Sequence, residues 1–300
     1  MPKCAVIVIT YNGKQWYDKC LQSILSSSIS LDVIVIDNNS TDDTVDYINN
    51  NFPEVKVIKN NENVGFAKAN NIGLNIAYNN GSKYFFLLNQ DAWVEYNTIE
   101  TLITIAEKHK NDFGIISPIH LTANKDFFDR GFIKYFYEDS YTIHAYENLF
   151  LKKLQPVLYE SRFVNAAAWL ITRKCVETVG GFDTTMFKHY GEDLNYCQRV
   201  FFHGLKIGIA PSATICHDRA DRIDSPYDPA IDFSVFYGNI LFKNQFYLYH
   251  IFKILIKSCF RTPTKHLKEI LFVVKNAVRI HRSRKMNKTM GRGLEYLEKI

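Results

Sequence analysis

The sequence of 300 residues lacks the patterns that mark several large protein classes. None of its six cysteines belongs to a C-x-x-C pair, and several lie in or beside apolar runs, where free cysteine behaves as a small hydrophobic residue. No stretch of about 18 uncharged apolar residues exists, so no ordinary transmembrane helix is expected. The first residues do not have the form of a signal peptide. Together these absences favour a reduced, cytoplasmic location.

Charge is unevenly distributed along the chain. Hydrophobic residues make up 47% and charged residues 22%, which is typical of one large domain or of one domain with an appendage. Residues 234–300 contain nine Lys and five Arg against three Glu, a net charge of +11, so residues 1–233 carry −6 of the total of +5. We therefore predict a main domain over residues 1–233 and a basic helical extension over residues 234–300 that meets an anionic partner.

The order of predicted elements indicates an α/β fold. Short apolar runs rich in β-branched residues predict buried strands at residues 4–10, 33–36, 55–58, 84–88, 113–117, 163–172 and 205–210. Apolar residues at helical spacing predict helices at residues 14–28, 66–78, 97–109 and 192–203, with further helix starts at Ser40 and Arg173. Strands that alternate with helices through short links form a mostly parallel sheet flanked by helices. The alternation fades between residues 118 and 162, where aromatic residues are frequent.

Polar segments follow three of the predicted strands. They are TYN at residues 10–12, DNNS at residues 37–40 and NQD at residues 89–91. Because ligands of open α/β sheets bind beyond the carboxyl ends of the strands, we expect these segments to converge on one nucleotide site. The sequence has neither G-x-G-x-x-G nor G-x-x-x-x-G-K-[ST], so the phosphates need another counter-charge. A divalent cation held by oxygen ligands would supply it.

Eight segments in order resemble glycosyltransferase family 2. They are VIVITYN, VIDNNSTDDT, NENVGFAKANNIG, LLNQDA, NAAAWLIT, GGFDTTMF, GEDLNYCQR and ICHDR. The resemblance covers residues 3–220 and, within the family, is strongest to the rhamnosyltransferase-type enzymes of bacterial surface polysaccharides. It implies a GT-A fold with a nucleotide-sugar-binding half at residues 1–117 and an acceptor and catalytic half at residues 118–233. It also implies inverting transfer of a sugar from dTDP-rhamnose or a UDP-hexose to a glycan or polyprenyl-linked acceptor.

The resemblance further implies roles for single residues. The residues matched to the nucleotide-sugar pocket are Thr10, Tyr11, Asn12, Asp37, Asn38, Gly65, Asn70 and Asn89. Asp91 matches the metal ligand of the D-x-D motif, His217 stands where a residue often completes the site for Mg²⁺ or Mn²⁺, and Asp193 matches the catalytic base. The first Asp of D-x-D is Asn89 here, which removes one formal negative charge and predicts modest metal affinity.

The predicted chemistry follows from charge. As the sugar–phosphate bond breaks, negative charge grows on the diphosphate, and a cation at Asp91 and His217 would neutralise it. The attacking acceptor hydroxyl must lose a proton, which Asp193 would accept. One base and one displacement invert the anomeric centre, whereas retention would need a second, nucleophilic carboxylate, and none is apparent in the sequence.

Each of these residues also has a structural interpretation. Asp37 and Asp91 are residue types that cap helices and form turns. The acidic pair at residues 192–193 stands at a predicted helix start, where acids favour the helix dipole. A lone His at a strand end, such as His217, is more often structural than a metal ligand. Trp169 could stack on an acceptor sugar or pack in the core.

Two other functions remain open at this level. A sugar nucleotidyltransferase would normally have a Gly-rich loop with Lys or Arg after the first strand, where this sequence has TYNGK. A non-catalytic nucleotide-sugar-binding protein would be expected to lack Asp91 and Asp193, and both are present. The aromatic residues between 127 and 141 are compatible with an acceptor lid or with the core of a subdomain.

Cations interleave with aromatic and aliphatic residues from 241 to 260. This pattern is typical of a helix at a membrane interface, with its apolar face in lipid and its Lys side chains near the headgroups. No recognised nucleic-acid-binding motif is present, so we expect no nucleic-acid partner. We expect the extension to dock the protein peripherally on the inner face of the plasma membrane, where a polyprenyl-linked acceptor would lie.

Overall fold

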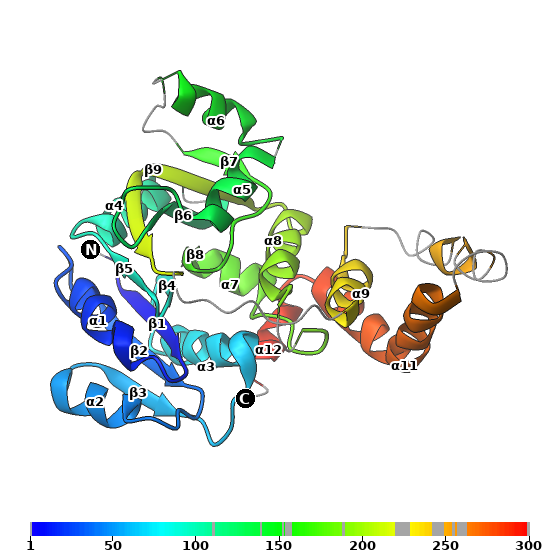
Figure 1. The fold of residues 1–300 in the computed structure, drawn as a ribbon, viewed down its shortest axis with the longest axis horizontal. Coiled ribbons are helices and arrows are strands. Elements are labelled where there is room, and N and C mark those ends of the chain that lie inside the picture. Colours follow the sequence, from blue (N-terminus) through cyan, green and yellow to red (C-terminus); the bar gives the residue numbers. More distant parts are fainter. Residues whose placement is uncertain are drawn as a thin grey trace.

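A nine-stranded sheet organises the computed structural model, which describes residues 2–109, 112–138, 140–151, 153, 158–187, 190–219, 229–241, 249–253, 256 and 263–298 (Figure 1). The strands are β1 (Cys4–Thr10), β2 (Asp32–Asp37), β3 (Lys56–Lys59), β4 (Tyr84–Asn89), β5 (Ala92–Val94), β6 (Phe113–Thr122), β7 (Tyr159–Ser161), β8 (Ala168–Thr172) and β9 (Lys206–His217). Their order is β3-β2-β1-β4-β8-β6-β9-β5, with β7 beside β9.

The sheet has a parallel half and a mixed half. All pairs from β3 through β2 and β1 to β4 are parallel, as the alternation of strands and helices predicted. In the other half β6 and β9 are parallel, but β8 is antiparallel to β4 and β6, and β5 and β7 are antiparallel to β9. At three residues each, β5 and β7 are too short to show a strand pattern in the sequence. The sheet is therefore mixed rather than mostly parallel over its full width.

Three predicted strands end or begin elsewhere, and these differences shape the site. The predicted strand at 163–172 begins at Ala168, so residues 163–167 form an irregular segment. β6 continues past Pro118, where its pairing with β9 shifts in register, and β9 continues to His217. Proline interrupts regular pairing, so the sequence pattern predicted an end where the structure has an irregularity. The extended part of β9 carries His217 to the sheet edge.

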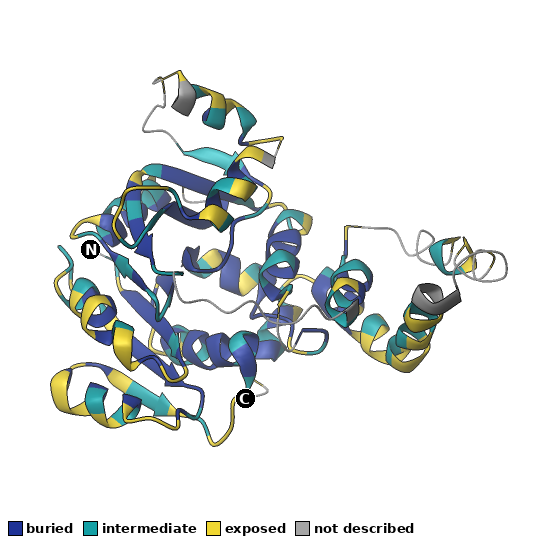
Figure 2. Cartoon of the chain, viewed as in Figure 1, coloured by how far each residue is buried: buried dark blue, intermediate teal, exposed yellow. Residues whose placement is uncertain are grey.

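Helices cover both faces of the sheet (Figure 1). They are α1 (Tyr17–Leu25), α2 (Thr44–Asn51), α3 (Gly65–Asn79), α4 (Thr98–Lys108), α5 (Arg130–Glu138), α6 (Ile143–Phe150), α7 (Arg173–Val179), α8 (Glu192–Phe202), α9 (Pro229–Gly238), α11 (Pro263–Lys288) and α12 (Glu295–Glu298), with 3-10 turns at Lys14–Trp16 and Arg292–Leu294. In β1, Ala5 and Ile7 pack with α3, α7 and α8, whereas Val6 and Val8 pack with α1, α2 and α4. This burial on both faces explains why the strand sequences are continuously apolar. Figure 2 shows the buried residues concentrated in the sheet and along the helix sides that face it.

The core settles two questions that the sequence left open. Trp169 is fully buried and stacks on Phe182, with ring centroids 6.1 Å apart, so it is a core residue rather than a sugar platform. In α5, Phe132 and Phe136 are buried and stack at 5.8 Å, whereas Phe127 nearby is 74% exposed. The buried members of this aromatic group belong to the main hydrophobic core. The five cysteines in the described ranges are free and buried.

The end of the predicted extension packs on the main body. Asp183 is fully buried and accepts hydrogen bonds from Ser283 Oγ and from Asn287 Nδ2, the latter at 2.7 Å. Arg199, also fully buried, donates to the carbonyl oxygens of Gly181 at 2.7 Å and of Val179. A boundary near residue 234 stays a prediction, but α11 is fixed to the body at its C-terminal end. Residues 242–248, 254–255 and 257–262, which carry much of the predicted interfacial pattern, lie outside the described residues. No helix within the described ranges is long and apolar enough to span a bilayer.

Candidate active site

Two adjoining cavities lie at the carboxyl ends of the central strands. The strand-end cavity, of about 380 Å³, lies where β1, β2 and β4 end. Of the predicted residues it is lined by Thr10, Tyr11, Asn38, Gly65, Asn89 and Asp91. The carboxylate cavity, of about 580 Å³, is lined by Asn89 and Asp193 together with Arg219 just after β9, Ile231 of α9 and residues of the 163–167 segment. Phe66 and Asn89 line both cavities, so a ligand in one can touch a ligand in the other.

The loops around the strand-end cavity are joined by side-chain hydrogen bonds. Gln90 Oε1 accepts from Thr10 Oγ1 at 2.7 Å and from the backbone N–H of Tyr11 at 3.1 Å. Asn12 donates through its backbone N–H to Ser40 Oγ at 2.9 Å, and its Oδ1 accepts from the backbone N–H of Thr41 at 2.9 Å. These bonds fix the loops after β1, β2 and β4 relative to one another, so the cavity is largely formed before any ligand binds.

Three predicted pocket residues do not line this cavity. Asp37 is fully buried and accepts hydrogen bonds from the backbone N–H of Ser40 at 3.1 Å and from Ser40 Oγ, as a turn-forming aspartate does. Asn70 is buried in α3, where its Nδ2 donates to the carbonyl of Phe66 at 3.0 Å. Asn12 forms the hydrogen bonds to Ser40 and Thr41 that join the loops. Their direct contact with a nucleotide stays a prediction, and their observed role is to hold the cavity walls.

The N-terminus of α3 faces the strand-end cavity. Gly65 begins the helix with φ +82°, a left-handed conformation that favours glycine, and Phe66 follows it into the cavity wall. Asn38 Nδ2 donates to the carbonyl of Gly65 at 3.5 Å, and Asn60 Nδ2 donates to Asn38 Oδ1 at 3.0 Å. The free N–H groups and the dipole of a helix N-terminus favour anionic groups such as phosphates.

Asp91 and His217 lie side by side at the edge of this cavity. Asp91 Oδ1 is 3.3 Å from His217 Nε2, although the two residues are separated by more than a hundred positions in the sequence. The pairing of β5 with β9 sets Ala92 opposite His217 and so fixes this proximity. His217 Nδ1 faces the buried carboxylate of Asp129, with Oδ2 at 3.5 Å. Asp129 Oδ1 in turn accepts from the backbone N–H of Phe132 at 2.8 Å and thereby caps α5.

Glu192 and Asp193 form the acidic wall of the carboxylate cavity. They occupy the first turn of α8, after Gly191 with φ +86°. Burial raises the pKa of Glu192 to about 7, with a further contribution from the neighbouring charge of Asp193. Burial also raises the pKa of Asp193, and the backbone N–H groups of Leu194 and Ala166 oppose that shift. A carboxylate with a raised pKa beside a cavity is well suited to accept a proton.

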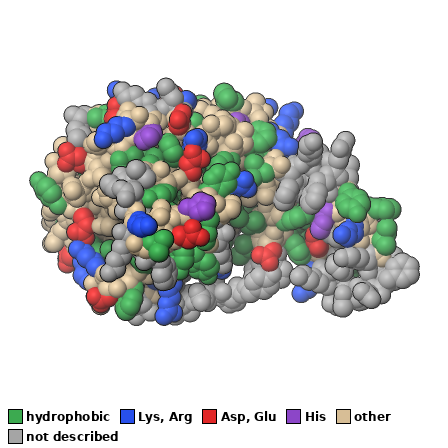
Figure 3. Space-filling view, turned by 90° about the horizontal axis from the view of Figure 1, so that it is seen from above, with side chains coloured by type: hydrophobic (Ala, Val, Ile, Leu, Met, Phe, Trp, Pro, Cys, Tyr) green, Lys and Arg blue, Asp and Glu red, His purple; other side chains and the backbone are tan. Residues whose placement is uncertain are grey.

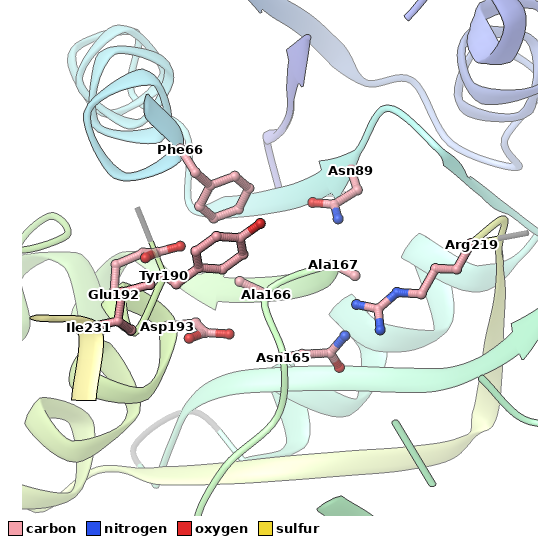
Figure 4. Close-up of a pocket in the computed structure, with 10 residues that line it drawn as sticks. All are labelled: Phe66, Asn89, Asn165, Ala166, Ala167, Tyr190, Glu192, Asp193, Arg219 and Ile231. Carbon is pink, nitrogen blue, oxygen red and sulfur yellow. The ribbon is translucent and has the colours of Figure 1, made fainter. Parts of the chain in front are cut away.

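The other walls of the carboxylate cavity are polar and aromatic (Figure 4). Asn89, Asn165 and Arg219 lie across from the acidic pair, and Phe66 and Tyr190 form an aromatic edge. Both amide atoms of Asn165 and Oε2 of Glu192 are buried without a hydrogen-bond partner among the described residues. Unpaired polar atoms are costly in a protein interior, so these atoms are suited to bind the hydroxyls of a ligand.

Comparison with known families assigns the chain to one of them. The model of glycosyl transferase family 2 matches residues 5–177, which is more than half of the sequence. The chain belongs to glycosyl transferase family 2. The matched region includes every residue that lines the strand-end cavity except Asp218, whereas Asp193 and His217 lie beyond it.

Individual relatives share part of this family 2 chain. It is 31% identical over 129 residues to an uncharacterized glycosyltransferase of Haemophilus influenzae, covering 42% of the chain and 39% of the relative. It is 36% identical over 96 residues to the Escherichia coli UDP-Glc:alpha-D-GlcNAc-diphosphoundecaprenol beta-1,3-glucosyltransferase WfaP, covering 31% of the chain and 38% of the relative. The chain thus spans about two fifths of the length of these curated relatives.

Solved structures confirm the GT-A fold expected from the sequence. Staphylococcus aureus TarS 1–349 in complex with UDP-GlcNAc superimposes with a TM-score of 0.60 at 12% identity, covering 98% of this chain and 89% of that one. At this identity the likeness concerns the fold. The family 2 assignment and the GT-A fold therefore agree with each other and with the motif order in the sequence.

Sequence reasoning assigned no role to several residues of this family 2 site, including Phe66 and Tyr190 and four polar residues. Gln90 and Arg219 lie inside two of the recognised segments, LLNQDA and ICHDR. Their polar side chains at those positions were the signal that could have identified them as site residues. Asn165 was placed within a strand, which hid its position at the cavity. Asp129 lies in the aromatic region where the sequence gives no periodic signal, and only the fold brings it behind His217.

Proposed function

We propose that the chain is an inverting glycosyltransferase that moves a sugar from a nucleotide-sugar to a hydroxyl of a glycan or lipid-linked acceptor. The observation that carries this proposal is the boundary shared by the two cavities, which Phe66 and Asn89 form. Direct displacement requires donor and acceptor to meet in van der Waals contact, and adjoining cavities with a shared wall allow this.

The strand-end cavity is the proposed donor site. Its oxygen- and amide-bearing walls, together with the N-terminus of α3, suit a nucleoside diphosphate. A donor carrying uridine is favoured by two similar proteins, since the TarS complex contains UDP-GlcNAc and the name of WfaP specifies UDP-Glc. The proposed donors are therefore a UDP-hexose and, from the sequence resemblance, dTDP-rhamnose.

The residues at the edge of the proposed donor site fit a divalent cation. Asp91 and His217 offer one oxygen and one nitrogen 3.3 Å apart, and Asp129 stands behind His217 as an outer partner. Within the described ranges, no group of three or more His, Cys, Asp or Glu side chains is arranged to hold a metal. Two protein ligands suffice for Mg²⁺ or Mn²⁺ when substrate phosphates and water complete the coordination. Such a cation would neutralise charge on the leaving diphosphate.

The carboxylate cavity is the proposed acceptor site. Asp193 is the proposed base, because its side chain lines the cavity and its pKa is raised by burial. Phe66 and Tyr190 offer ring faces to an acceptor sugar, and Asn165 offers unpaired amide atoms to its hydroxyls. A polyprenyl-linked acceptor is proposed because WfaP, by its name, acts on a diphosphoundecaprenol-linked sugar. Attack from this cavity on a donor held beyond Asn89 would invert the anomeric centre.

A donor screen tests the proposal. Purified protein is incubated with Mn²⁺ or Mg²⁺ and a panel of UDP- and dTDP-sugars, and donor binding is followed by thermal shift. Release of nucleoside diphosphate is then measured with mono- and disaccharide or prenyl-linked acceptors. We expect one donor class to raise the melting temperature and Asp91→Ala to lower turnover by about 10²- to 10³-fold. No binding of any donor, or unchanged turnover in Asp91→Ala, would refute the proposal.

A further inference from the structure

Helix α11 carries an exposed apolar row. Leu267, Leu271, Val274 and Val278 recur at alternating spacings of four and three residues, which places them on one face of the helix. They are 54%, 48%, 70% and 81% exposed. A large apolar surface left open to water on one helix face marks a contact site rather than a random surface feature.

A row of cations runs beside the apolar row. Lys268, Lys275 and Arg282 recur every seven residues, each exposed, and none forms an ion pair with a described residue. The helix contains one acidic residue, Glu269, which faces the interior of the helical region. Its carboxylate accepts from the hydroxyl of Tyr237 at 3.0 Å and lies 3.2 Å from His250 Nε2. The outward face of α11 is therefore apolar and basic.

The protein body holds α11 at its C-terminal end and leaves this face outward. Asp183 binds Ser283 and Asn287, as described above, and Arg279 donates to the carbonyl of Thr185 at 2.7 Å. In Figure 1 the helix extends away from the sheet, and in Figure 3 apolar and basic side chains occur together at that end of the molecule. The apolar row therefore lies on a helix that contacts with the main body hold in place.

We propose that this α11 face, formed by the four apolar residues and the three cations, docks on an anionic phospholipid surface. Apolar side chains would enter the headgroup boundary, while Lys and Arg stay with the lipid phosphates. A second copy of the chain would fit less well, because its own cation row would lie close to this one and repel it. The face lies in α11, which follows the 241–260 segment that the sequence pattern predicted to be a membrane-interface helix.

The docking face is connected to the carboxylate cavity by one helix. Ile231 of α9 lines that cavity, while Phe233 of the same helix packs on Phe272 of α11, with ring centroids 5.5 Å apart. Tyr237, one turn further along α9, bonds to Glu269 of α11. A membrane contact through α11 would hold the cavity near the lipid surface. This orientation rests on the proposed function, whereas lipid binding itself does not.

Vesicle co-sedimentation tests the proposal with the full chain. Binding is measured with phosphatidylcholine vesicles containing anionic phosphatidylglycerol and with vesicles of phosphatidylcholine alone. The test variants are Leu271→Glu combined with Val274→Glu, and the triple charge reversal of Lys268, Lys275 and Arg282 to Glu. The matched control reverses the exposed Lys56, Lys83 and Lys108 of the main body, which changes the net charge equally. Tyr96→Glu, at a 69% exposed aromatic residue before α4, controls for loss of apolar surface.

We expect wild type and both controls to bind the anionic vesicles, and salt to weaken that binding. Each removed cation contributes about 1 kcal/mol, or roughly fivefold in affinity, so the triple α11 variant should bind at least about 100-fold more weakly. Equal loss in the main-body charge control would overturn the assignment to α11. So would unchanged sedimentation of both α11 variants.

A second copy as the true partner would also be detected. In that case light scattering would show a dimer of the wild type that the α11 variants convert to monomer, with vesicle binding unaltered, and the proposal would be wrong. Turnover of a water-soluble acceptor without vesicles should be the same in the α11 variants as in wild type. Loss of vesicle binding with intact turnover therefore separates this proposal from the proposed activity.

Discussion

The two cavities of the site differ in how their polar groups are satisfied. Around the strand-end cavity, Gln90 and Asn12 join the loops after β1, β2 and β4 through hydrogen bonds within the protein. Around the carboxylate cavity, the amide of Asn165 and Oε2 of Glu192 are buried with no partner in the described part of the chain. The loops of the first cavity are thus joined by hydrogen bonds within the protein, whereas the second cavity has buried polar atoms that a ligand could pair.

The difference indicates a division of labour between the two halves of the sheet. A pre-formed donor cavity lowers the entropy that must be lost when a flexible nucleotide-sugar binds. Free polar atoms beside a raised-pKa carboxylate favour a hydroxyl-rich ligand that is also a proton donor. Changes around the strand-end cavity should therefore alter donor affinity, whereas changes around the carboxylate cavity should alter acceptor affinity or the chemical step.

The largest effect is expected at Asp193. Asp193→Asn keeps the shape of the side chain but cannot accept a proton, so kcat should fall about 10²- to 10⁴-fold while donor affinity stays near normal. Glu192→Gln is the neighbouring control, with a loss of less than about tenfold expected, since its pKa of about 7 leaves Glu192 partly protonated at neutral pH and Asp193 ionises first. Stopped or quenched turnover assays together with donor titration measure both quantities. A parallel loss of donor affinity in Asp193→Asn would show that the residue supports the fold instead.

The pH dependence of turnover should reveal the same base. Asp193 acts only when ionised, and burial raises its pKa above the ordinary value of 3.8. As pH falls below that raised pKa, kcat should decline about tenfold per pH unit, and above it kcat should level off. Glu192→Gln should leave this acid limb in place, because Glu192 titrates near 7 with Asp193 already ionised and is neutral where Asp193 takes up its proton. A shift of the acid limb in Glu192→Gln would indicate that Glu192 is the base instead.

Replacing Asp129 should have an effect of intermediate size, on metal affinity at the donor side. Its carboxylate lies 3.5 Å from His217 Nδ1, so it favours the tautomer in which Nε2 is free to face Asp91. Asp129→Asn should weaken Mn²⁺ binding about 10- to 100-fold, with kcat at saturating metal changed far less. Mn²⁺ titration by electron paramagnetic resonance in the presence of a nucleoside diphosphate measures the affinity directly. Asn still caps α5, so a fall in thermal stability is not expected, and such a fall would indicate a structural role.

The sequence predicted most of the parallel half of the fold. Continuous apolar runs such as residues 4–10 and 84–88 can be recognised because burial on both faces leaves no polar alternation. The mixed half was harder, since β5 and β7 have three residues each and residues 163–167 share the apolar composition of the strand that follows. Local pattern describes composition, whereas the end of a strand depends on which neighbour is available to pair.

Site residues divide in the same way. Asp91 and Asp193 could be proposed from their positions after a strand and at a helix start, and the structure sets them on adjoining cavities. The environment of Asp37 could not be predicted, because only the fold shows that its carboxylate turns inward to Ser40. The approach of Asp129 to His217 joins segments 88 positions apart through β6 and β9, and no short motif records such a contact.

The smallest and most discriminating effects compare Gln90→Ala with Asn165→Ala. Gln90→Ala removes bonds that hold Thr10 and Tyr11, each contributing about 0.5–1.5 kcal/mol, so the KM for the donor should rise about tenfold and the melting temperature should fall. Asn165→Ala removes an amide that has no partner in the described part of the chain, so the melting temperature should not fall, while the KM for the acceptor should rise about fivefold. Steady-state kinetics with each substrate varied, together with calorimetry, distinguish the two patterns. A drop in stability for Asn165→Ala, or a rise in donor KM for that variant, would show that the two cavities are not divided between donor and acceptor as the hydrogen-bond pattern indicates.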